Sequence, residues 1–435
     1  MPASRLYLLF QQHPLISTDS RSVAKNSLFF ALKGEHFNGN TFAAAALESG
    51  AAYAIIDEEE YAGDERCILV ADVLSALQDL AREHRENLDI PVIGMTGSNG
   101  KTTTKELLAA VLRQKFSTFA TAGNLNNHIG VPLSVLSISA AHEMAVIEMG
   151  ANHQKEIELL CSICRPTHGL ITNVGKAHLE GFGGFEGVKK AKGELYAWIA
   201  ESGGTAFVNF DNTALMEMLE KNGVKKAVYY GTTNDSRVQA RLVKSSPYLK
   251  IEWWKTGTPE TVHDIHSHLT GAYNAENMLA AVCIGDFFGI EGQQIDLGIS
   301  GYHPSNNRSQ IMQTENNTLI CDFYNANPSS MSAALENFAR IDARKKAIIL
   351  ADMLELGIES PGEHDEVIRH ALEVPNDLCI FVGPDFFRFR DEREGEYFEN
   401  TAGALAWLQK NPLKEHSILL KGSRGMALEK LIPAL

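Results

Sequence analysis

IPVIGMTGSNGKTTTKELL, residues 90–108, joins an apolar run, a glycine-rich turn and the start of a helix. Phosphate-binding loops have this context, because the N–H groups of the turn and of the helix N-terminus point at an anion. The strict pattern G-x-x-x-x-G-K-[ST] fails by one position, since Met95 stands where its first glycine should be. Gly100-Lys101-Thr102 in this context nevertheless favours a phosphate loop over an ordinary glycine-rich turn.

The working loop is therefore predicted to be shorter than the strict pattern, with Met95 still inside the strand. Lys101 can reach the outer phosphates of a nucleoside triphosphate, and the Thr102 hydroxyl can bind Mg²⁺. The residues predicted to bind the nucleotide here are Thr96, Gly97, Ser98, Asn99, Gly100, Lys101, Thr102 and Thr103.

Polar residues follow the next two strands. Glu148 ends the apolar run 145–147, where a carboxylate is poised to hold Mg²⁺; a solvated strand-end carboxylate is the alternative. His178 lies in a glycine-rich segment after a further strand, where the backbone can approach a ligand closely, although a loop histidine can also be merely solvated. Lys192 opens a helix and would bring a second cation close to the phosphates.

Composition limits the class of protein. The chain has 435 residues, enough for two to four domains, and a net charge of -15 that argues against nucleic-acid binding. No run approaches the ~18 apolar residues of a membrane span. The N-terminus is a poor signal peptide. The six cysteines suit buried thiols in a reducing compartment, and Cys161 and Cys164 are interpreted as core residues rather than a redox or zinc motif. We expect a cytoplasmic protein.

Strands alternate with helices in three blocks, which predicts an α/β protein of three domains. Residues 1–89 form a smaller α/β domain. Residues 90–303 form a central domain with a doubly wound parallel sheet like that of P-loop NTPases, including a strand-rich insert at 237–257. Residues 304–435 form a Rossmann-like α/β domain, and the turn-rich stretch 301–310 is interpreted as the linker. Ligands of such sheets bind at the carboxyl ends of the strands.

Motifs spread over most of the chain carry a resemblance. In order they are TGSNGKTTTKELL, TAGNLNNHIGVPL, EMGANH, TNVGKAHLEGFGG, AKGEL, DFYNANPSSM, DMLELG and KGSRGM. Together they closely resemble the Mur ligase family of peptidoglycan synthesis, whose ATP-dependent members form amide bonds on a UDP-N-acetylmuramoyl precursor. Folylpolyglutamate synthases share the wider fold.

Within the family, GNLNNHIGVPL and YNANPSSM are similar to the member that adds D-alanyl-D-alanine to UDP-N-acetylmuramoyl-tripeptide. The resemblance implies an ADP-forming ligase that works through an acyl phosphate, with 1–89 binding the UDP-sugar, 90–303 binding ATP and 304–435 binding the dipeptide. The alternatives are a sibling ligase that adds another amino acid, a folylpolyglutamate synthase-like ligase, and a nucleotide-switch ATPase without ligase chemistry. The third residue of the tripeptide stays open, and we expect a monomer.

The resemblance also implies roles for single residues. Lys101, Glu148, His178 and Lys192 would be catalytic, with Thr102 and Glu148 holding one Mg²⁺ and His178 and a carbamylated Lys192 serving a second. A carbamate makes physical sense, because a cationic lysine cannot ligate Mg²⁺ whereas its CO₂ adduct is an anionic oxygen donor. Asn274, Asn277, Arg308 and Asp322 would complete the ATP site. The implied substrate-binding residues are Ser20, Arg21, Lys33, Asn124, Asn126, Asn127, Asn325, Asn327 and Pro328. This interpretation gives no role to His263, His266 and His268. They could form a metal cluster, or they could simply be solvated.

Overall fold

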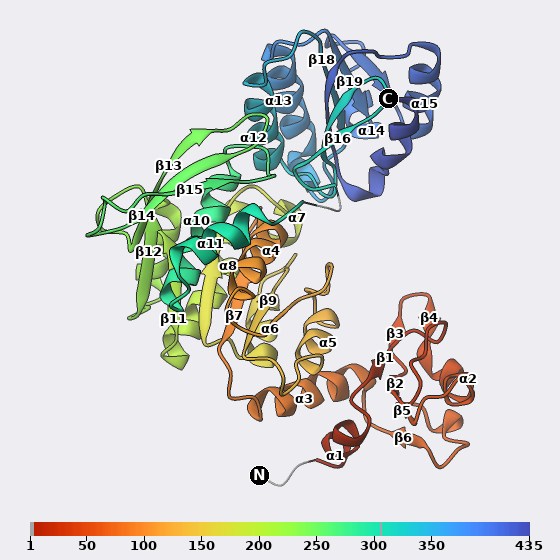
Figure 1. The fold of residues 1–435 in the computed structure, drawn as a ribbon. Helices are drawn as coiled ribbons and strands as arrows, with labels where there is room; N and C mark the ends of the chain where they lie inside the picture. The colour runs from red at the N-terminus through yellow and green to blue at the C-terminus, as the bar shows by residue number, and fades with distance from the viewer. Residues whose placement is uncertain (1–3, 305–306) are drawn as a thin grey trace.

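Three main sheets, each with its own helices, follow one another along the chain (Figure 1). The computed structural model describes residues 4–304 and 307–435. The predicted linker 301–310 includes residues 305 and 306, which lie outside the described residues. No helix in the described part of the chain is long and apolar enough to cross a membrane. The expected three-domain α/β architecture is confirmed.

The N-terminal sheet is parallel, with the strand order β1-β2-β5-β6. Its strands are β1 (Ile16–Ser17), β2 (Leu28–Phe30), β5 (Tyr53–Ile56) and β6 (Cys67–Leu69), and a small hairpin of β3 (Lys33–Gly34) and β4 (Phe37–Asn38) projects from it. Its helices are α1 (Arg5–Gln12) and α2 (Ala43–Glu48), with single 3-10 turns at Gly39–Phe42 and Glu59–Tyr61. Phe29, Ala54 and Ile56 pack against Ala46 and Leu47 of α2, which gives this small unit a core of its own.

Helix α3 (Val73–Glu86) joins the N-terminal sheet to the central one. Asp72 caps it by accepting a hydrogen bond from the Ser75 N–H at 2.7 Å. Leu77 and Leu80 are buried in the core that this helix shares with both domains. Near its C-terminal end, buried Arg85 donates to the carbonyl oxygens of Cys164 (2.9 Å), Leu88 (2.7 Å) and Arg165 (3.2 Å). The Arg85 guanidinium thus binds α3 to backbone carbonyl groups of the central domain.

The central sheet has nine strands in the order β15-β14-β13-β12-β11-β10-β7-β9-β8. They are β7 (Val92–Thr96), β8 (Thr118–Ala120), β9 (Met144–Glu148), β10 (His168–Ile171), β11 (Thr205–Asn209), β12 (Ala227–Gly231), β13 (Val238–Lys244), β14 (Lys250–Lys255) and β15 (His263–His266). The sheet is mixed rather than wholly parallel as expected: the insert at 237–257 supplies β13, which runs parallel to β12, and β14, which folds back antiparallel and is followed by antiparallel β15.

Helices cover both faces of the central sheet, so its middle strands are buried on both sides. In β9, Met144 and Val146 face the layer that holds α4 and α10, whereas Ala145 and Ile147 face the layer of α5, α6 and α8. The helices are α4 (Lys101–Leu112), α5 (Gly130–Leu136), α6 (Glu156–Cys164), α7 (Leu179–Phe182), α8 (Phe185–Ser202), α9 (Thr213–Lys221), α10 (Asn274–Phe287) and α11 (Gly292–Ser300).

The C-terminal sheet has the order β16-β17-β21-β18-β19-β20, parallel except for the edge strand β16. Its strands are β16 (Gln310–Gln313), β17 (Thr318–Asp322), β18 (Lys346–Ala351), β19 (Leu378–Val382), β20 (Glu396–Phe398) and β21 (Ser417–Lys421). The helices are α12 (Pro328–Ala339), α13 (Ser360–Glu373), α14 (Pro384–Phe387) and α15 (Thr401–Lys410), with 3-10 turns at Gly357–Glu359, Arg424–Met426 and Leu428–Ala434. Both sides of this sheet are covered, as in a Rossmann-like domain.

The fastening of α3 gives a first test. We predict that Arg85→Ala lowers the free energy of unfolding by about 2–4 kcal/mol, because buried carbonyl groups lose their donor. Arg82 lies one turn earlier on the same helix and pairs with exposed Asp79 at 2.6 Å. Arg82→Ala should therefore cost about 0.5 kcal/mol or less. Urea denaturation of both variants checks this, and equal losses would contradict the role given to Arg85.

Candidate active site

The turn between β7 and α4 needs glycine at two positions. Gly97 has φ +152°, and a Cβ there would lie 2.0 Å from the Thr172 hydroxyl oxygen. Gly100 has φ +77°, and a Cβ there would lie 2.6 Å from the Asn277 amide oxygen. Met95 is fully buried within β7, as the sequence predicted. The turn therefore begins at Gly97. Its backbone can lie directly against Thr172 and Asn277 because glycine has no side chain.

Residues after β10 hold the turn in shape. The Asn173 side chain accepts a hydrogen bond from the Asn99 N–H at 3.0 Å and donates to the Asn99 carbonyl oxygen at 3.0 Å. Thr172 donates to the same carbonyl at 2.6 Å. The Ser98 N–H donates to the Asn173 carbonyl at 3.0 Å. A loop fixed from outside keeps its amide groups pre-arranged for an anion.

Lys101 lies over the turn that it follows. Its Nζ donates to the carbonyl oxygens of Gly97 at 2.6 Å and Ser98 at 3.3 Å. Burial lowers the pKa of Lys101, while the Glu148 carboxylate opposes that shift. The ammonium group is therefore held at the loop, where a phosphate chain would meet it.

Glu148 and Thr102 meet at the carboxyl edge of the sheet. The Thr102 hydroxyl donates to the two Glu148 carboxylate oxygens at 3.0 and 3.2 Å, and the Asn126 side chain donates to one of them at 2.9 Å. Glu148 is 1% exposed. The fully buried Lys105 lies 4.0 Å from this carboxylate and donates to the Thr121 carbonyl at 2.6 Å. A hydroxyl and a carboxylate side by side form the oxygen-rich donor set that fits Mg²⁺.

His178 lies directly before α7, and Lys192 lies within α8. His178 has a left-handed backbone (φ +51°) before α7, and its Nδ1 contacts the carboxylate of Glu355 from the C-terminal domain. Lys192 is 2% exposed, with Nζ 3.4 Å from the Ala151 carbonyl oxygen. Burial, and then the charge of Lys101, hold the pKa of Lys192 well below its ordinary value. Both effects favour the neutral amine over the ammonium form.

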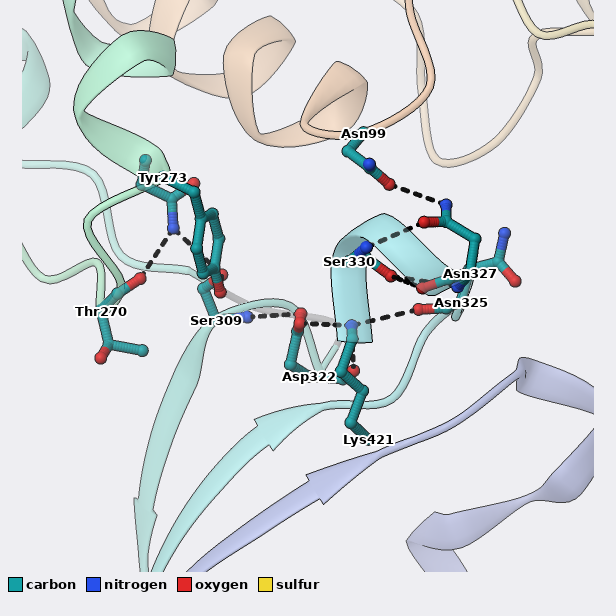
Figure 2. Close-up of polar contacts among 10 residues, drawn as sticks. Asn99, Thr270, Tyr273, Ser309, Asp322, Asn325, Asn327, Ser330 and Lys421 are labelled. Atoms are coloured by element: carbon teal, nitrogen blue, oxygen red, sulfur yellow. Dashed lines mark hydrogen bonds and ion pairs between the residues drawn. The ribbon is translucent and has the colours of Figure 1, made fainter. Parts of the chain in front are cut away.

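Helix α10 and the C-terminal domain join this site through a chain of polar contacts, of which Figure 2 shows the part at Ser309 and Asp322. Asn277 accepts from the Thr104 hydroxyl at 3.0 Å and donates to Asn274 at 2.8 Å, and Asn274 donates to the Ser309 hydroxyl at 3.1 Å. The Ser309 N–H donates to the Asp322 carboxylate at 3.3 Å.

A second bridge crosses at the phosphate loop itself. Asn327 caps α12 by accepting from the Ser330 N–H at 2.9 Å, and its side-chain amide donates to the Asn99 side chain at 2.8 Å (Figure 2). Lys176, in the loop after β10, pairs with Glu363 of α13 at 2.6 Å. The loop that shapes the phosphate turn therefore also touches the C-terminal domain.

These groups line one cavity of about 670 Å³. It brings together most of the predicted residues: Ser98, Asn99, Gly100, Lys101, Thr102, Thr103, Asn124, Asn126, Asn127, Glu148, His178, Asn274, Asn277, Arg308, Asp322, Asn325 and Asn327. Thr96, Gly97, Lys192 and Pro328 are adjacent to lining residues in sequence or contact but do not line it.

Three predicted residues lie elsewhere, in the N-terminal domain. Arg21 pairs with Asp19 at 2.7 Å and its side chain is 87% exposed. Lys33 pairs with Asp57 at 2.9 Å and with Glu58 at 2.8 Å. Neither they nor Ser20 line the cavity, so a ligand that touched them would have to span the two domains.

Sequence reasoning missed several lining residues. Tyr273 precedes Asn274 and shares a 3.1 Å hydrogen bond with Ser309. Lys421 ends strand β21 and pairs with Asp322 at 2.6 Å. Tyr324 and Glu156 also line the cavity. Lys421 and Tyr324 could have been found, because both follow apolar strands whose carboxyl ends the topology brings together.

Of the three histidines without a predicted role, His263 has a clear structural role. His263 stacks on buried Trp253, with ring centroids 4.3 Å apart, and its Nδ1 lies 2.7 Å from the Asp296 carboxylate. His268 instead stacks on His303 at 3.9 Å. Within residues 4–304 and 307–435, no group of three or more histidine, cysteine or acidic side chains is arranged to hold a metal ion. A metal cluster built from His263, His266 and His268 is therefore not supported.

Known proteins match nearly the whole length of this chain. Family models described as Mur ligase family, catalytic domain; Mur ligase middle domain; and Mur ligase, glutamate ligase domain match residues 14–85, 95–285 and 307–424. A Bacillus subtilis relative called UDP-N-acetylmuramoyl-tripeptide--D-alanyl-D-alanine ligase is 33% identical, covering 97% of this chain and 92% of the relative.

Solved structures are similar as well. A crystal structure of MurF from Acinetobacter baumannii has a TM-score of 0.87 at 32% identity, covering 96% of this chain and 92% of that one. The MurF ligase from Thermotoga maritima in complex with ADP has a TM-score of 0.86 at 25% identity, covering 99% and 98%.

The close approach at Gly97 gives a second test. We predict that Gly97→Ala weakens ADP binding at least about tenfold, because its Cβ would displace Thr172 and with it the Asn99 backbone. Gly203→Ala is the matched control: its φ of +68° is also left-handed, but a Cβ there has nothing within 4 Å. Isothermal titration with ADP measures both, and unchanged affinity in Gly97→Ala would contradict the assignment of the loop.

Proposed function

Because the chain belongs to the Mur ligase family, we propose that it joins D-alanyl-D-alanine to UDP-N-acetylmuramoyl-tripeptide with conversion of ATP to ADP. The single observation that carries this proposal is the cavity itself, in which a phosphate loop, a buried carboxylate and residues of the C-terminal domain meet. The product would be the pentapeptide precursor of peptidoglycan. Relatives that carry this activity in their names match 97% of the chain, which favours it over a sibling ligase.

ATP would bind with its phosphates on the loop of residues 96–103. Lys101 supplies the positive charge there, and backbone N–H groups at the start of α4 supply donors. Asn274 and Asn277 would lie on the adenine side, and Arg308 and Asp322 would approach from the C-terminal domain. The ADP complex of the Thermotoga maritima protein, which has the same fold, supports nucleotide binding by this chain.

Mg²⁺ would be held by Thr102 and Glu148, with His178 and a carbamylated Lys192 serving a second ion, and the ions would neutralise charge on the phosphates. The donor set fits one ion directly, since Thr102 and Glu148 are already in contact. The second would require His178 to exchange its Glu355 contact.

The reaction follows from the chemistry of the ends that are joined. A carboxylate does not condense with an amine in water unless it is activated. The terminal carboxylate of the tripeptide would attack the γ-phosphorus of ATP, releasing ADP and giving an acyl phosphate. The amine of the dipeptide then attacks the acyl carbon, and the tetrahedral intermediate expels phosphate as the amide forms. Lys101 offsets the repulsion between the anionic nucleophile and the phosphate, and closure of the C-terminal domain excludes water.

The three domains would divide the substrates between them. Residues 1–89, with Ser20, Arg21 and Lys33, would bind the UDP-sugar. Residues 90–303 would bind ATP and, through Asn124, Asn126 and Asn127, the peptide end of the precursor. Residues 304–435 would bring the dipeptide, near Asn325, Asn327 and Pro328. The six free cysteines suit an enzyme of the reducing cytoplasm, and we expect it to act as a monomer.

A substrate panel tests the activity. We predict phosphate release from ATP only when UDP-N-acetylmuramoyl-tripeptide and D-alanyl-D-alanine are both present, and little or none when single amino acids replace the dipeptide. Lys101→Ala should abolish release while the thermal transition stays close to that of the unaltered chain. Release without the dipeptide would favour an ATPase, and preference for a single amino acid would favour a sibling ligase.

Carbamylation of Lys192 has its own test. Its lowered pKa raises the share of neutral amine, the form that reacts with CO₂. We predict that native mass spectrometry in bicarbonate detects one added CO₂, absent from Lys192→Arg. Lys189→Arg is the control, because Lys189 lies on the same helix and pairs with exposed Glu186 at 3.1 Å. A bare amine at Lys192 in bicarbonate would contradict the modification.

A further inference from the structure

The loops after β17, β18 and β21 lie at one edge of the C-terminal sheet, where the loop after β17 and the end of β21 line the cavity. Gly422 lets the loop after β21 approach β18, since a Cβ there would lie 2.5 Å from that of Ala351. The Leu354 N–H donates to the Ser423 hydroxyl at 3.1 Å, and the Ser423 N–H donates to the Asp352 carbonyl at 3.2 Å. The backbone that carries the next residue, Arg424, is therefore fixed.

Two guanidinium groups lie over the ring of Tyr324, which lines the cavity. The guanidinium carbon of Arg308 is 3.6 Å from the ring centroid, and that of Arg424 is 5.2 Å from it. Arg424 also donates from Nη1 to the Tyr324 hydroxyl at 3.2 Å. The aromatic ring and its hydroxyl thus orient the Arg424 side chain at the rim of the cavity.

The dipeptide needs a positively charged group at this edge of the sheet. It enters with a terminal carboxylate as well as the amine that attacks, and a carboxylate is best bound by a guanidinium fork. Three cations of the C-terminal domain are close to this edge: Arg308 and Lys421 line the cavity, and Arg424 contacts Tyr324, which lines it.

Two of these cations have other partners. Lys421 is 2% exposed and paired with Asp322, and it also donates to the Asn325 carbonyl at 3.5 Å (Figure 2). Arg308 is assigned above to ATP. Arg424 is exposed, and in the described ranges no carboxylate lies within ion-pair distance of it.

We propose that Arg424, oriented by Tyr324, binds the terminal carboxylate of the incoming dipeptide. This rests on the proposed function and names the group that reads one end of its second substrate. With the carboxylate held at the rim, the amine at the other end of the dipeptide points inward to the acyl phosphate. A compound of the same shape without that negative charge loses this contact.

The test compares D-alanyl-D-alanine with D-alanyl-D-alaninamide, which differs only in its uncharged end. Phosphate release is measured at saturating ATP and UDP-sugar peptide. In Arg424→Ala the KM for the dipeptide should rise about 10- to 100-fold, the range for a lost charged hydrogen bond, with kcat within about twofold and the KM for ATP unchanged. The unaltered chain should prefer the acid to the amide by a similar factor, and Arg424→Ala should accept both alike.

Two further variants complete the design. Arg390→Ala is the matched control, because Arg390 is also an exposed arginine over an aromatic ring, with its guanidinium carbon 4.6 Å from the Phe387 centroid. It should leave both KM values unchanged. Arg424→Lys keeps the charge but not the planar guanidinium fork. It should still prefer the acid to the amide, with a KM for the dipeptide between those of the unaltered chain and Arg424→Ala. This variant also keeps the proposal testable if Arg424→Ala folds poorly.

The outcomes are separable. If the unaltered chain turns over and Arg424→Ala keeps the full preference for the acid, the assignment of Arg424 is overturned while the proposed function stands. The same holds if the KM for ATP rises in step with that for the dipeptide. If the unaltered chain releases no phosphate with the dipeptide, the proposed function itself fails.

Discussion

The contact between the Thr102 hydroxyl and the Glu148 carboxylate is the constraint on which the rest of the site depends. It exists because β7 and β9 are adjacent parallel strands, with Met95 opposite Glu148, so that the first turn of α4 and the end of β9 must meet. Burial makes the contact matter: a carboxylate that is 1% exposed is costly unless it is paired. Asn126 and Lys105 supply further partners, and thereby tie the asparagine-rich loop 124–127 to the same point.

The loop after β10 carries that constraint to the C-terminal domain. At its start, Thr172 and Asn173 hold the Asn99 backbone, and a few residues later Lys176 pairs with Glu363. A movement of the C-terminal domain relative to the central domain would therefore change the geometry of the phosphate turn. This coupling suits a reaction whose reactive acyl phosphate must form only in a closed, dry site.

Much of this arrangement was predictable from sequence, for a physical reason. Apolar runs that end in Thr96, Glu148, Asp322 or Lys421 are buried strands, and parallel topology brings their carboxyl ends to one edge. Local patterns could not reveal contacts made across domains, such as Asn327 with Asn99 or Glu355 with His178. They also could not show that the insert at 237–257 extends the central sheet with antiparallel strands, since pairing direction is set by the hairpin rather than by composition.

The central claim is that this edge of the sheet activates a carboxylate by phosphorylation. The most direct measurement labels the terminal carboxylate of UDP-N-acetylmuramoyl-tripeptide with ¹⁸O and analyses the phosphate released during a single turnover with ATP and D-alanyl-D-alanine. An acyl phosphate requires one carboxylate oxygen to leave with the phosphate, so the account predicts ¹⁸O-labelled phosphate and a pentapeptide amide that retains the other oxygen. Unlabelled phosphate, with the departing ¹⁸O released as water instead, would contradict it.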